Sequence, residues 1–239
     1  MAEKRGWESA EAARRYLEAV NVSSPKRQEI LSLISDLAAA FLPEQPRILD
    51  LGAGAGDLTN EILEYRPGAH AWLLDLSEEM VRVSRERFEG NPHIHVLRHD
   101  LDEGLPAQVK TQDFDAVVSC FSIHHVRPER RLPLYAGVHR ILKPGGLFIN
   151  GDRFRAESPE IAEWERDNFT KARLSAYQQY SGQQITFEQA KKEQIECEKQ
   201  MGDRPGTVWQ MEADLRQAGF VYVDCIWKYH IMGIVVAVK

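Results

Sequence analysis

The feature that most constrains the fold is a run of three glycines that joins a short apolar segment to an amphipathic one. Residues 52–56 read Gly-Ala-Gly-Ala-Gly, between a strand-like stretch at 47–51 and a helical pattern from about 58 to 65. Glycine has no Cβ, so this turn can adopt positive φ and lie against a bound molecule that a side chain would block. A strand, a glycine turn and a helix in this order predict a nucleotide-type cofactor site.

The spacing of the glycines separates two classes of cofactor. Dinucleotide sites favour G-x-G-x-x-G, whereas Gly52, Gly54 and Gly56 form G-x-G-x-G. The next residue, Asp57, would repel a pyrophosphate at the start of the helix. The pattern therefore favours a positively charged cofactor without phosphate and argues against a nicotinamide-dependent dehydrogenase.

The rest of the chain repeats the alternation of strands and helices. Ser77 is predicted to cap the helix after the second strand, and predicted strands lie at 71–76, 93–98, 115–121 and 147–150. The last two strands, 220–227 and 231–238, are close enough for an antiparallel hairpin. We therefore expect an α/β fold with a doubly wound, seven-stranded, mostly parallel sheet and ligands at the carboxyl ends of its strands.

Helical segments flank this core. Residues 1–42 are predicted to form N-terminal helices, the second beginning with Ser24 as N-cap and Pro25 at its first position, and Tyr16 is expected to help cover the site. Residues 153–206 are predicted to be a helical cap insertion, in which Gly182 ends a first helix and Thr186 with Gln189 forms a capping box. The whole chain, 1–239, is expected to be a single domain.

Composition narrows the function classes. Thirty basic against thirty-six acidic residues give a net charge of −6, which disfavours nucleic acid as a partner. The three cysteines show no paired spacing, and no stretch reaches the roughly 18 apolar residues of a membrane span. We expect a cytoplasmic protein without a membrane partner; its oligomeric state stays open, a homodimer being one option.

Residues 48–56, Ile-Leu-Asp-Leu-Gly-Ala-Gly-Ala-Gly, resemble the first motif of the class I S-adenosylmethionine-dependent methyltransferases, whose core is Rossmann-like. The predicted fourth strand at 114–121 and the Lys-Pro-Gly-Gly turn at 143–146 are also similar to this family. The resemblance covers most of the chain outside 153–206. It implies S-adenosylmethionine as cofactor, S-adenosylhomocysteine as product, and methyl transfer by direct displacement.

The resemblance also implies roles for three carboxylates. Asp75, at the end of the second strand, would accept hydrogen bonds from the ribose hydroxyls; Asp100 would lie near the adenine amino group; and Asp50 would contact the amino-acid end, directly or through water. Each has a simpler alternative, as a cap of the glycine turn, a helix cap or part of an acidic loop. The predicted cofactor-binding set is Asp50, Gly52, Ala53, Gly54, Asp75, Leu76, Met80, Asp100, Leu101, Ser119 and Phe121.

Two adjacent histidines follow the fourth strand, where cofactor and acceptor should meet. His124 or His125 is a candidate general base, because imidazole titrates near neutral pH. The alternative is a polar loop that frames the cofactor. Metal binding by the pair with Asp152 or His230 is not predicted, since no known ligand spacing supports it.

The sequence therefore predicts methyl transfer to a small-molecule acceptor, because a histidine-pair loop and a helical insertion are similar to small-molecule methyltransferases. Two alternatives stay open. One is an enzyme related to tRNA modification that uses or makes carboxy-S-adenosylmethionine. The other is a module that binds S-adenosylmethionine without catalysis.

Overall fold

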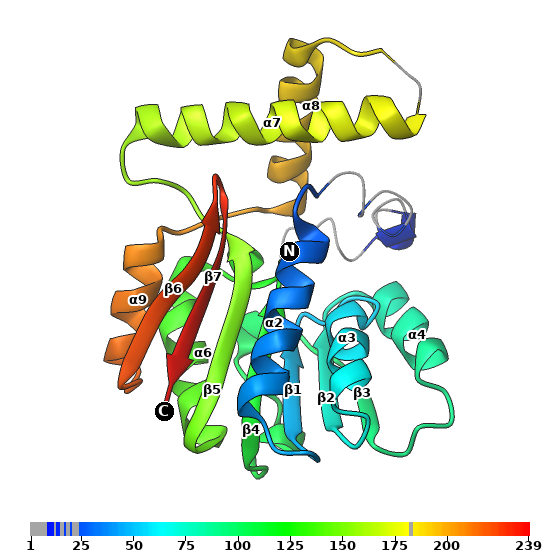
Figure 1. The fold of residues 1–239 in the computed structure, drawn as a ribbon, viewed down its shortest axis with the longest axis vertical. Helices are drawn as coiled ribbons and strands as arrows, with labels where there is room; N and C mark the ends of the chain where they lie inside the picture. The colour runs from blue at the N-terminus through cyan, green and yellow to red at the C-terminus, as the bar shows by residue number, and fades with distance from the viewer. Residues whose placement is uncertain (1–8, 12, 15–16, 18–19, 21–23, 182–183) are drawn as a thin grey trace.

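The computed structural model describes residues 9–11, 13, 14, 17, 20, 24–181 and 184–239. Within them one seven-stranded sheet has the order β3-β2-β1-β4-β5-β7-β6, in which all neighbours pair in parallel except β7, which is antiparallel to both β5 and β6 (Figure 1). This confirms the predicted fold class. The strands are β1 (Arg47–Leu51), β2 (His70–Asp75), β3 (Ile94–Arg98), β4 (Phe114–Cys120), β5 (Leu142–Arg153), β6 (Tyr222–Tyr229) and β7 (Met232–Val238).

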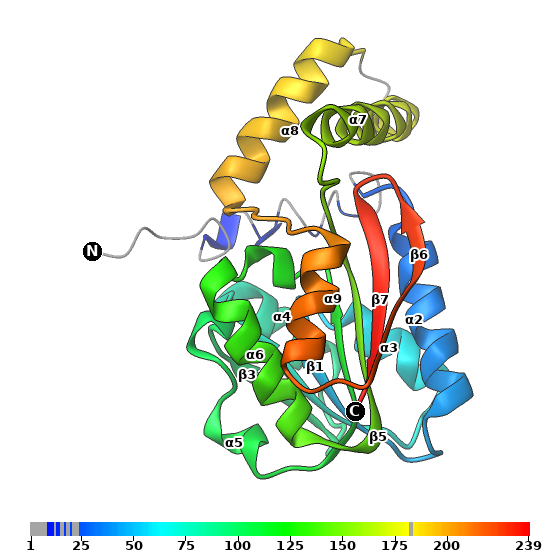
Figure 2. The same ribbon diagram turned by 90° about the vertical axis from the view of Figure 1, so that its left-hand side faces the viewer.

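Helices cover both faces of the sheet, as Figure 2 shows edge-on. One face carries α2 (Arg27–Phe41), α3 (Asp57–Tyr65) and α4 (Glu78–Arg87). The other carries α5 (Ala107–Lys110), α6 (Pro128–Ile141) and α9 (Val208–Gln217), with two short 3-10 turns, η2 (Leu101–Glu103) and η3 (Ile123–His125). The elements of each face enclose a separate apolar cluster.

The central strands are apolar on both sides because each side faces one of these clusters. In β4, Val117 packs into the cluster under α6 and α9, whereas Ala116 and Val118 pack into the cluster under α2 and α3. Successive side chains of a strand point to opposite faces, so a doubly covered strand becomes a continuous apolar run.

Two helices, α7 (Pro159–Ser181) and α8 (Phe187–Met201), lie beyond the carboxyl ends of the parallel strands (Figure 1). Thr186 and Gln189 form the predicted capping box at the start of α8. None of the described helices combines the length and the apolar composition that a membrane span needs.

The division of the chain into one domain with a cap stays a prediction. The predictions for Tyr16 and Gly182 concern residues that lie outside the described part of the chain.

One local prediction was wrong. Helix α2 begins at Arg27, and its N-cap is Lys26, with φ of 68° and no side-chain cap, rather than Ser24. Ser24 instead accepts a hydrogen bond from the backbone N–H of Arg27 through its own carbonyl oxygen, so Ser24 and Pro25 belong to a preceding turn.

Residues 143–146 fall within the bounds of β5 but interrupt its pairing with β4, which passes from Leu142 to Leu147. Gly145 has φ of 75°, as the third residue of the predicted turn would have.

We predict that Phe148→Ala will lower the free energy of unfolding by about 3–5 kcal/mol, the usual cost of emptying a buried aromatic site. Phe148 is fully buried, and its ring lies near those of Tyr135 and Phe220. Urea denaturation measures the change. The matched control, Phe41→Ala, removes a ring that is 69% exposed and should cost less than about 0.5 kcal/mol; equal losses would contradict this account of the core.

Candidate active site

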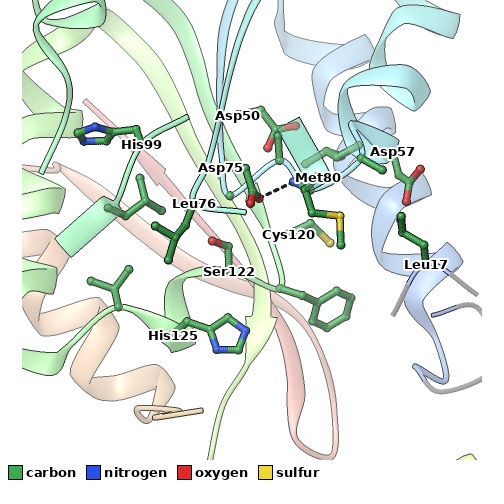
Figure 3. Close-up of a pocket in the computed structure, with 18 of the residues that line it drawn as sticks. Leu17, Asp50, Asp57, Asp75, Leu76, Met80, His99, Cys120, Ser122 and His125 are labelled. Carbon is green, nitrogen blue, oxygen red and sulfur yellow. Dashed lines mark hydrogen bonds between the residues drawn. The ribbon is translucent and has the colours of Figure 1, made fainter. Parts of the chain in front are cut away.

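A cavity opens at the carboxyl ends of β1, β2 and β4 and encloses about 940 Å³ with its mouth included (Figure 3). The structure brings most of the predicted site residues to its wall. These are Asp50, Gly52, Ala53, Gly54, Asp75, Leu76, Met80, Asp100, Leu101, Phe121 and His125. Two predicted residues, Ser119 and His124, do not line it.

Two glycines of the turn, Gly52 and Gly54, are explained by different surroundings. At Gly52, with φ of 67°, a Cβ would stand 1.7 Å from the hydroxyl of Ser122, so the loop after β4 excludes any side chain there. At Gly54, with φ of 55°, a Cβ would meet no heavy atom within 4 Å. The predicted access for a ligand therefore applies to Gly54, whereas Gly52 is required by packing within the protein.

Asp75, the last residue of β2, binds the backbone of the glycine turn through its carboxylate. Its Oδ2 accepts a hydrogen bond from the backbone N–H of Gly54, and its Oδ1 accepts one from the N–H of Ser77, both at 2.8 Å. Burial raises the pKa of this carboxyl group. A carboxylate offers about four lone-pair positions, so each oxygen can still accept one bond from a ligand with two hydroxyls.

Asp50 is fully buried at the floor of the cavity. Its Oδ2 accepts a hydrogen bond from the hydroxyl of Thr59 at 2.8 Å, while its Oδ1 has no hydrogen-bond partner within the described part of the chain. Burial raises its pKa to about 7, and the negative charges of Asp75 and Asp57 act in the same direction. An unsatisfied, buried carboxylate oxygen is suited to a cationic group of a ligand.

Asp57, which the sequence suggested would repel anions, is neutralised in the structure. Its two carboxylate oxygens form ion pairs with Arg27 of α2 and Arg87 of α4, each at 2.5 Å. Burial raises the pKa of Asp57, but the hydrogen bond from Arg87 and the charge of Arg27 outweigh it and leave the pKa lowered. Asp57 therefore links α3 to α2 and α4, and the two arginines offset its negative charge at the edge of the cavity.

The loop after β3 forms a further wall. Asp100 caps η2 by accepting a hydrogen bond from the N–H of Asp102 at 2.9 Å. The Nε2 of His99 donates to the carbonyl oxygen of Gly104 at 2.7 Å. These bonds hold Asp100 and Leu101 at the edge of the cavity, where both were predicted.

The prediction for Ser119 has no geometric support. Its side chain is fully buried, and its hydroxyl donates to the carbonyl oxygen of Leu51 at 2.9 Å, which ties β4 to β1. Phe121, two residues later, reaches the cavity because the chain turns there with φ of 55°. Such a left-handed conformation is costly for an aromatic residue and is held by surrounding contacts, including the bond from its N–H to the carbonyl of Gly151.

The two histidines have different surroundings. His124 is buried; its Nδ1 lies 2.5 Å from Oδ1 of Asp152, and its backbone N–H donates to the other oxygen of that carboxylate at 3.0 Å. His125 lines the cavity (Figure 3), and its Nδ1 lies 3.3 Å from Oδ1 of Asp203. Of the two candidate bases, only His125 is placed to meet a ligand in this cavity.

Several wall residues were missed by the sequence reasoning. Ser122 and Cys120 adjoin predicted residues, so their positions after β4 were a usable signal. Ala55, His99 and Val126 likewise adjoin predicted residues, and Asp57 and Leu58 follow the glycine turn. The remaining missed residues, Leu17, Arg27 and Leu31, come from distant segments and carry no local pattern. Asp203 follows Gly202, the left-handed C-cap of α8, and nothing in its neighbourhood marks it as a site residue.

Comparisons with known proteins agree with this geometry. Residues 48–146 match the family model described as a methyltransferase domain. The carboxy-S-adenosyl-L-methionine synthase of Aeromonas hydrophila is 27% identical over 223 residues, which are 91% of this chain and 84% of that protein. The putative methyltransferase YqeM of Bacillus subtilis is 33% identical over 114 residues, 46% of this chain and 43% of that protein.

Solved structures share the fold. Human N-acetylserotonin methyltransferase, in complex with SAM, superposes with a TM-score of 0.62 at 18% identity and covers 98% of this chain, which spans only 57% of that longer protein. A putative O-methyltransferase of Nostoc punctiforme gives a TM-score of 0.64 at 17% identity, over 95% of this chain and 60% of that one. A complex between the Trm112 methyltransferase activator and the putative methyltransferase of Haloferax volcanii also gives 0.64, at 17% identity and 99% coverage of both chains.

We predict that Asp50→Asn will change the pH dependence of stability. With a folded pKa near 7, Asp50 contributes stability that is fully present below about pH 4, where the unfolded carboxyl is also protonated, and that is lost as the pH rises to 7. Asparagine does not titrate. The melting temperature of the variant should therefore rise relative to wild type between pH 4 and 7 and level off above.

Thermal melts of the ligand-free protein in a series of buffers measure this difference. Asp36→Asn, at an exposed position of α2, is the matched control for replacing an aspartate by asparagine outside the cavity. A pH-independent difference for Asp50→Asn would mean that Asp50 has an ordinary pKa.

Proposed function

We propose that this class I S-adenosylmethionine-dependent methyltransferase transfers the methyl group of its cofactor to a small-molecule acceptor. One observation carries the proposal: the buried Oδ1 of Asp50, to which no described residue donates a hydrogen bond, and the open backbone of Gly54 lie in the same cavity as His125. A cationic donor would be held at one end and an acceptor would meet a proton-accepting side chain at the other.

The residues present fit the cofactor. Asp75 would accept hydrogen bonds from the ribose hydroxyls, Asp50 would accept one from the ammonium group of the methionine part, and Asp100 would lie by the adenine. Leu76, Met80 and Leu101 would form the apolar wall against the adenine ring. When bound, S-adenosylmethionine supplies a methyl group activated by the positive charge on sulfur.

His125 is the side chain that we assign to activation of the acceptor. Its ring lines the cavity, and the nearby carboxylate of Asp203 would stabilise the charge that it gains on taking a proton. His124 does not reach the cavity; held by Asp152, it positions the loop that carries His125. Orientation of donor and acceptor in one enclosed site supplies much of the remaining acceleration.

Synthesis of carboxy-S-adenosylmethionine is the second candidate, because the Aeromonas hydrophila relative bears that name. A carboxylated cofactor needs a cation for its additional carboxylate. Arg27 is the one arginine or lysine among the described residues that line the cavity, and it is paired with Asp57. Arg153, near His125, is paired with Glu198 and Asp203. This charge distribution favours methyl transfer.

Mass spectrometry of reaction mixtures tests the function. The protein is incubated with S-adenosylmethionine and fractions of a small-molecule extract. Formation of S-adenosylhomocysteine together with an acceptor heavier by one CH₂ group supports the proposal. A carboxylated cofactor without S-adenosylhomocysteine would establish the second candidate, and a bound but unchanged cofactor in every fraction would indicate a binding module; either result overturns the proposal.

We predict that Asp75→Ala will weaken the binding of S-adenosylhomocysteine by about 1.5–3 kcal/mol, the usual value of hydrogen bonds to a charged group. Titration calorimetry measures the dissociation constant. Asp36→Ala removes an exposed carboxylate outside the cavity and should leave the constant unchanged. Equal affinities for wild type and Asp75→Ala would remove Asp75 from the cofactor site.

A further inference from the structure

Three side chains that commonly bind metal ions meet beside the cofactor cavity. His124 and His125 belong to η3, and Asp203 follows α8; their ligand atoms all lie within 4.8 Å of one another. Oδ1 of Asp203 is 3.8 Å from Nε2 of His124 and 3.3 Å from Nδ1 of His125. Ligands at about 2.0–2.1 Å from a tetrahedral ion stand roughly 3.3 Å apart, so these atoms are already near the spacing of a coordination shell.

His124 has the orientation that metal-binding histidines have. The carboxylate of Asp152, 2.5 Å from Nδ1, holds the proton on that nitrogen, so that Nε2 presents a lone pair toward Asp203. A ring nitrogen bound in this way to a carboxylate is the usual outer contact of a histidine ligand. At 3.8 Å, Nε2 and the carboxylate oxygen are too far apart for a direct hydrogen bond, so the space between these two atoms can hold a bridging ion.

The ion pairs around the cluster engage only one of the two carboxylate oxygens of Asp203. Arg153 binds Oδ2 of Asp203 at 2.5 Å and Glu198 at 2.7 Å, which leaves Oδ1 of Asp203 directed at the histidines. Apart from the histidines, Arg153 is the one described residue with a side-chain ion pair to Asp203 or Asp152.

The remaining charged groups near the cluster have other contacts. Arg131 and Arg204 donate to backbone carbonyl oxygens of the histidine loop, and Arg166 faces Glu198 at 3.8 Å. The side chain of Asp203 is 7% exposed, so its Oδ1 faces the histidines rather than solvent.

We propose that His124, His125 and Asp203 bind one divalent first-row transition-metal ion, such as Zn²⁺. Two imidazole nitrogens and one carboxylate oxygen suit such ions better than Mg²⁺ or Ca²⁺, which prefer oxygen ligands. Three protein ligands leave a coordination position open. Because His125 also lines the cavity (Figure 3), this proposal rests on the proposed function and deepens it: with the ion bound, the ion rather than the free imidazole of His125 would activate the nucleophilic group of the acceptor.

The test is calorimetry with Zn²⁺ on the full chain after treatment with a chelator and dialysis. We expect one ion per chain, and a weakening of at least tenfold in His125→Gln and in Asp203→Asn, since each removes one ligand. Asp152→Asn, which alters only the outer contact of His124, should weaken binding by about 10–100-fold. The matched control is His93→Gln, which removes an exposed histidine from the other close pair, His70 and His93, with ring centroids 4.1 Å apart; it should bind Zn²⁺ as wild type does.

Absence of a stoichiometric ion in wild type would overturn the proposal, as would unchanged affinity in His125→Gln and Asp203→Asn or loss of binding in His93→Gln. Cooperative melting and S-adenosylhomocysteine binding identify variants that remain folded. Should neither ligand variant fold, the wild type decides: bound Co²⁺ must show the strong visible absorption of a tetrahedral site, and excess Mg²⁺ must not displace Zn²⁺.

The two proposals fail separately. Cofactor binding and methyl transfer by a wild-type protein that binds no stoichiometric Zn²⁺ would overturn the metal site and leave the proposed function standing. Tight binding of Zn²⁺ by a protein that binds no S-adenosylmethionine would overturn the proposed function and leave the metal site standing.

Discussion

The hydrogen bond from the N–H of Gly54 to Asp75 is the contact on which the cavity depends. It joins the turn after β1 to the end of β2, and a second bond, from the N–H of Ala53 to the carbonyl of Leu74, lies beside it. The parallel register of Leu51 with Leu74 brings these groups to the same edge of the sheet. Because Gly54 has positive φ, its N–H can face Asp75 while its backbone stays open to a ligand.

This arrangement concentrates negative charge in a buried place. Asp50 and Asp75 have no arginine or lysine partner among the described residues, and burial raises the pKa of both. Asp57, which lies nearby, is neutralised by Arg27 and Arg87. The one arginine or lysine among the described residues that line the cavity, Arg27, is paired with Asp57, which disfavours a phosphate-bearing cofactor. A cationic ligand would instead pair with Oδ1 of Asp50, which has no hydrogen-bond partner among the described residues.

The parts of the site that could be predicted from the sequence are those set by local geometry. The glycine turn, Asp75, the cap at Ser77 and the capping box at Thr186 each depend on residues a few positions apart. Ser119 does not line the cavity because its hydroxyl binds the carbonyl oxygen of Leu51 between β4 and β1, a contact that depends on strand pairing and not on local sequence. Arg27 and Asp203 reach the site through packing of distant segments, for which a single sequence gives no signal.

The loop after β4 connects the two halves of the chemistry. Its residues Phe121 and Ser122 face the cofactor cavity, where Ser122 packs against Gly52, while His124 and His125 contact Asp152 of β5 and Asp203 of the segment after α8. In the proposed function, the sheet and the glycine turn would hold the methyl donor, and these segments follow a shared pattern. The acceptor would meet His125, whose neighbour Asp203 comes from the segment 153–206, which follows none. A change of sequence in that segment can therefore alter the surroundings of His125 without changing Asp50 or Asp75.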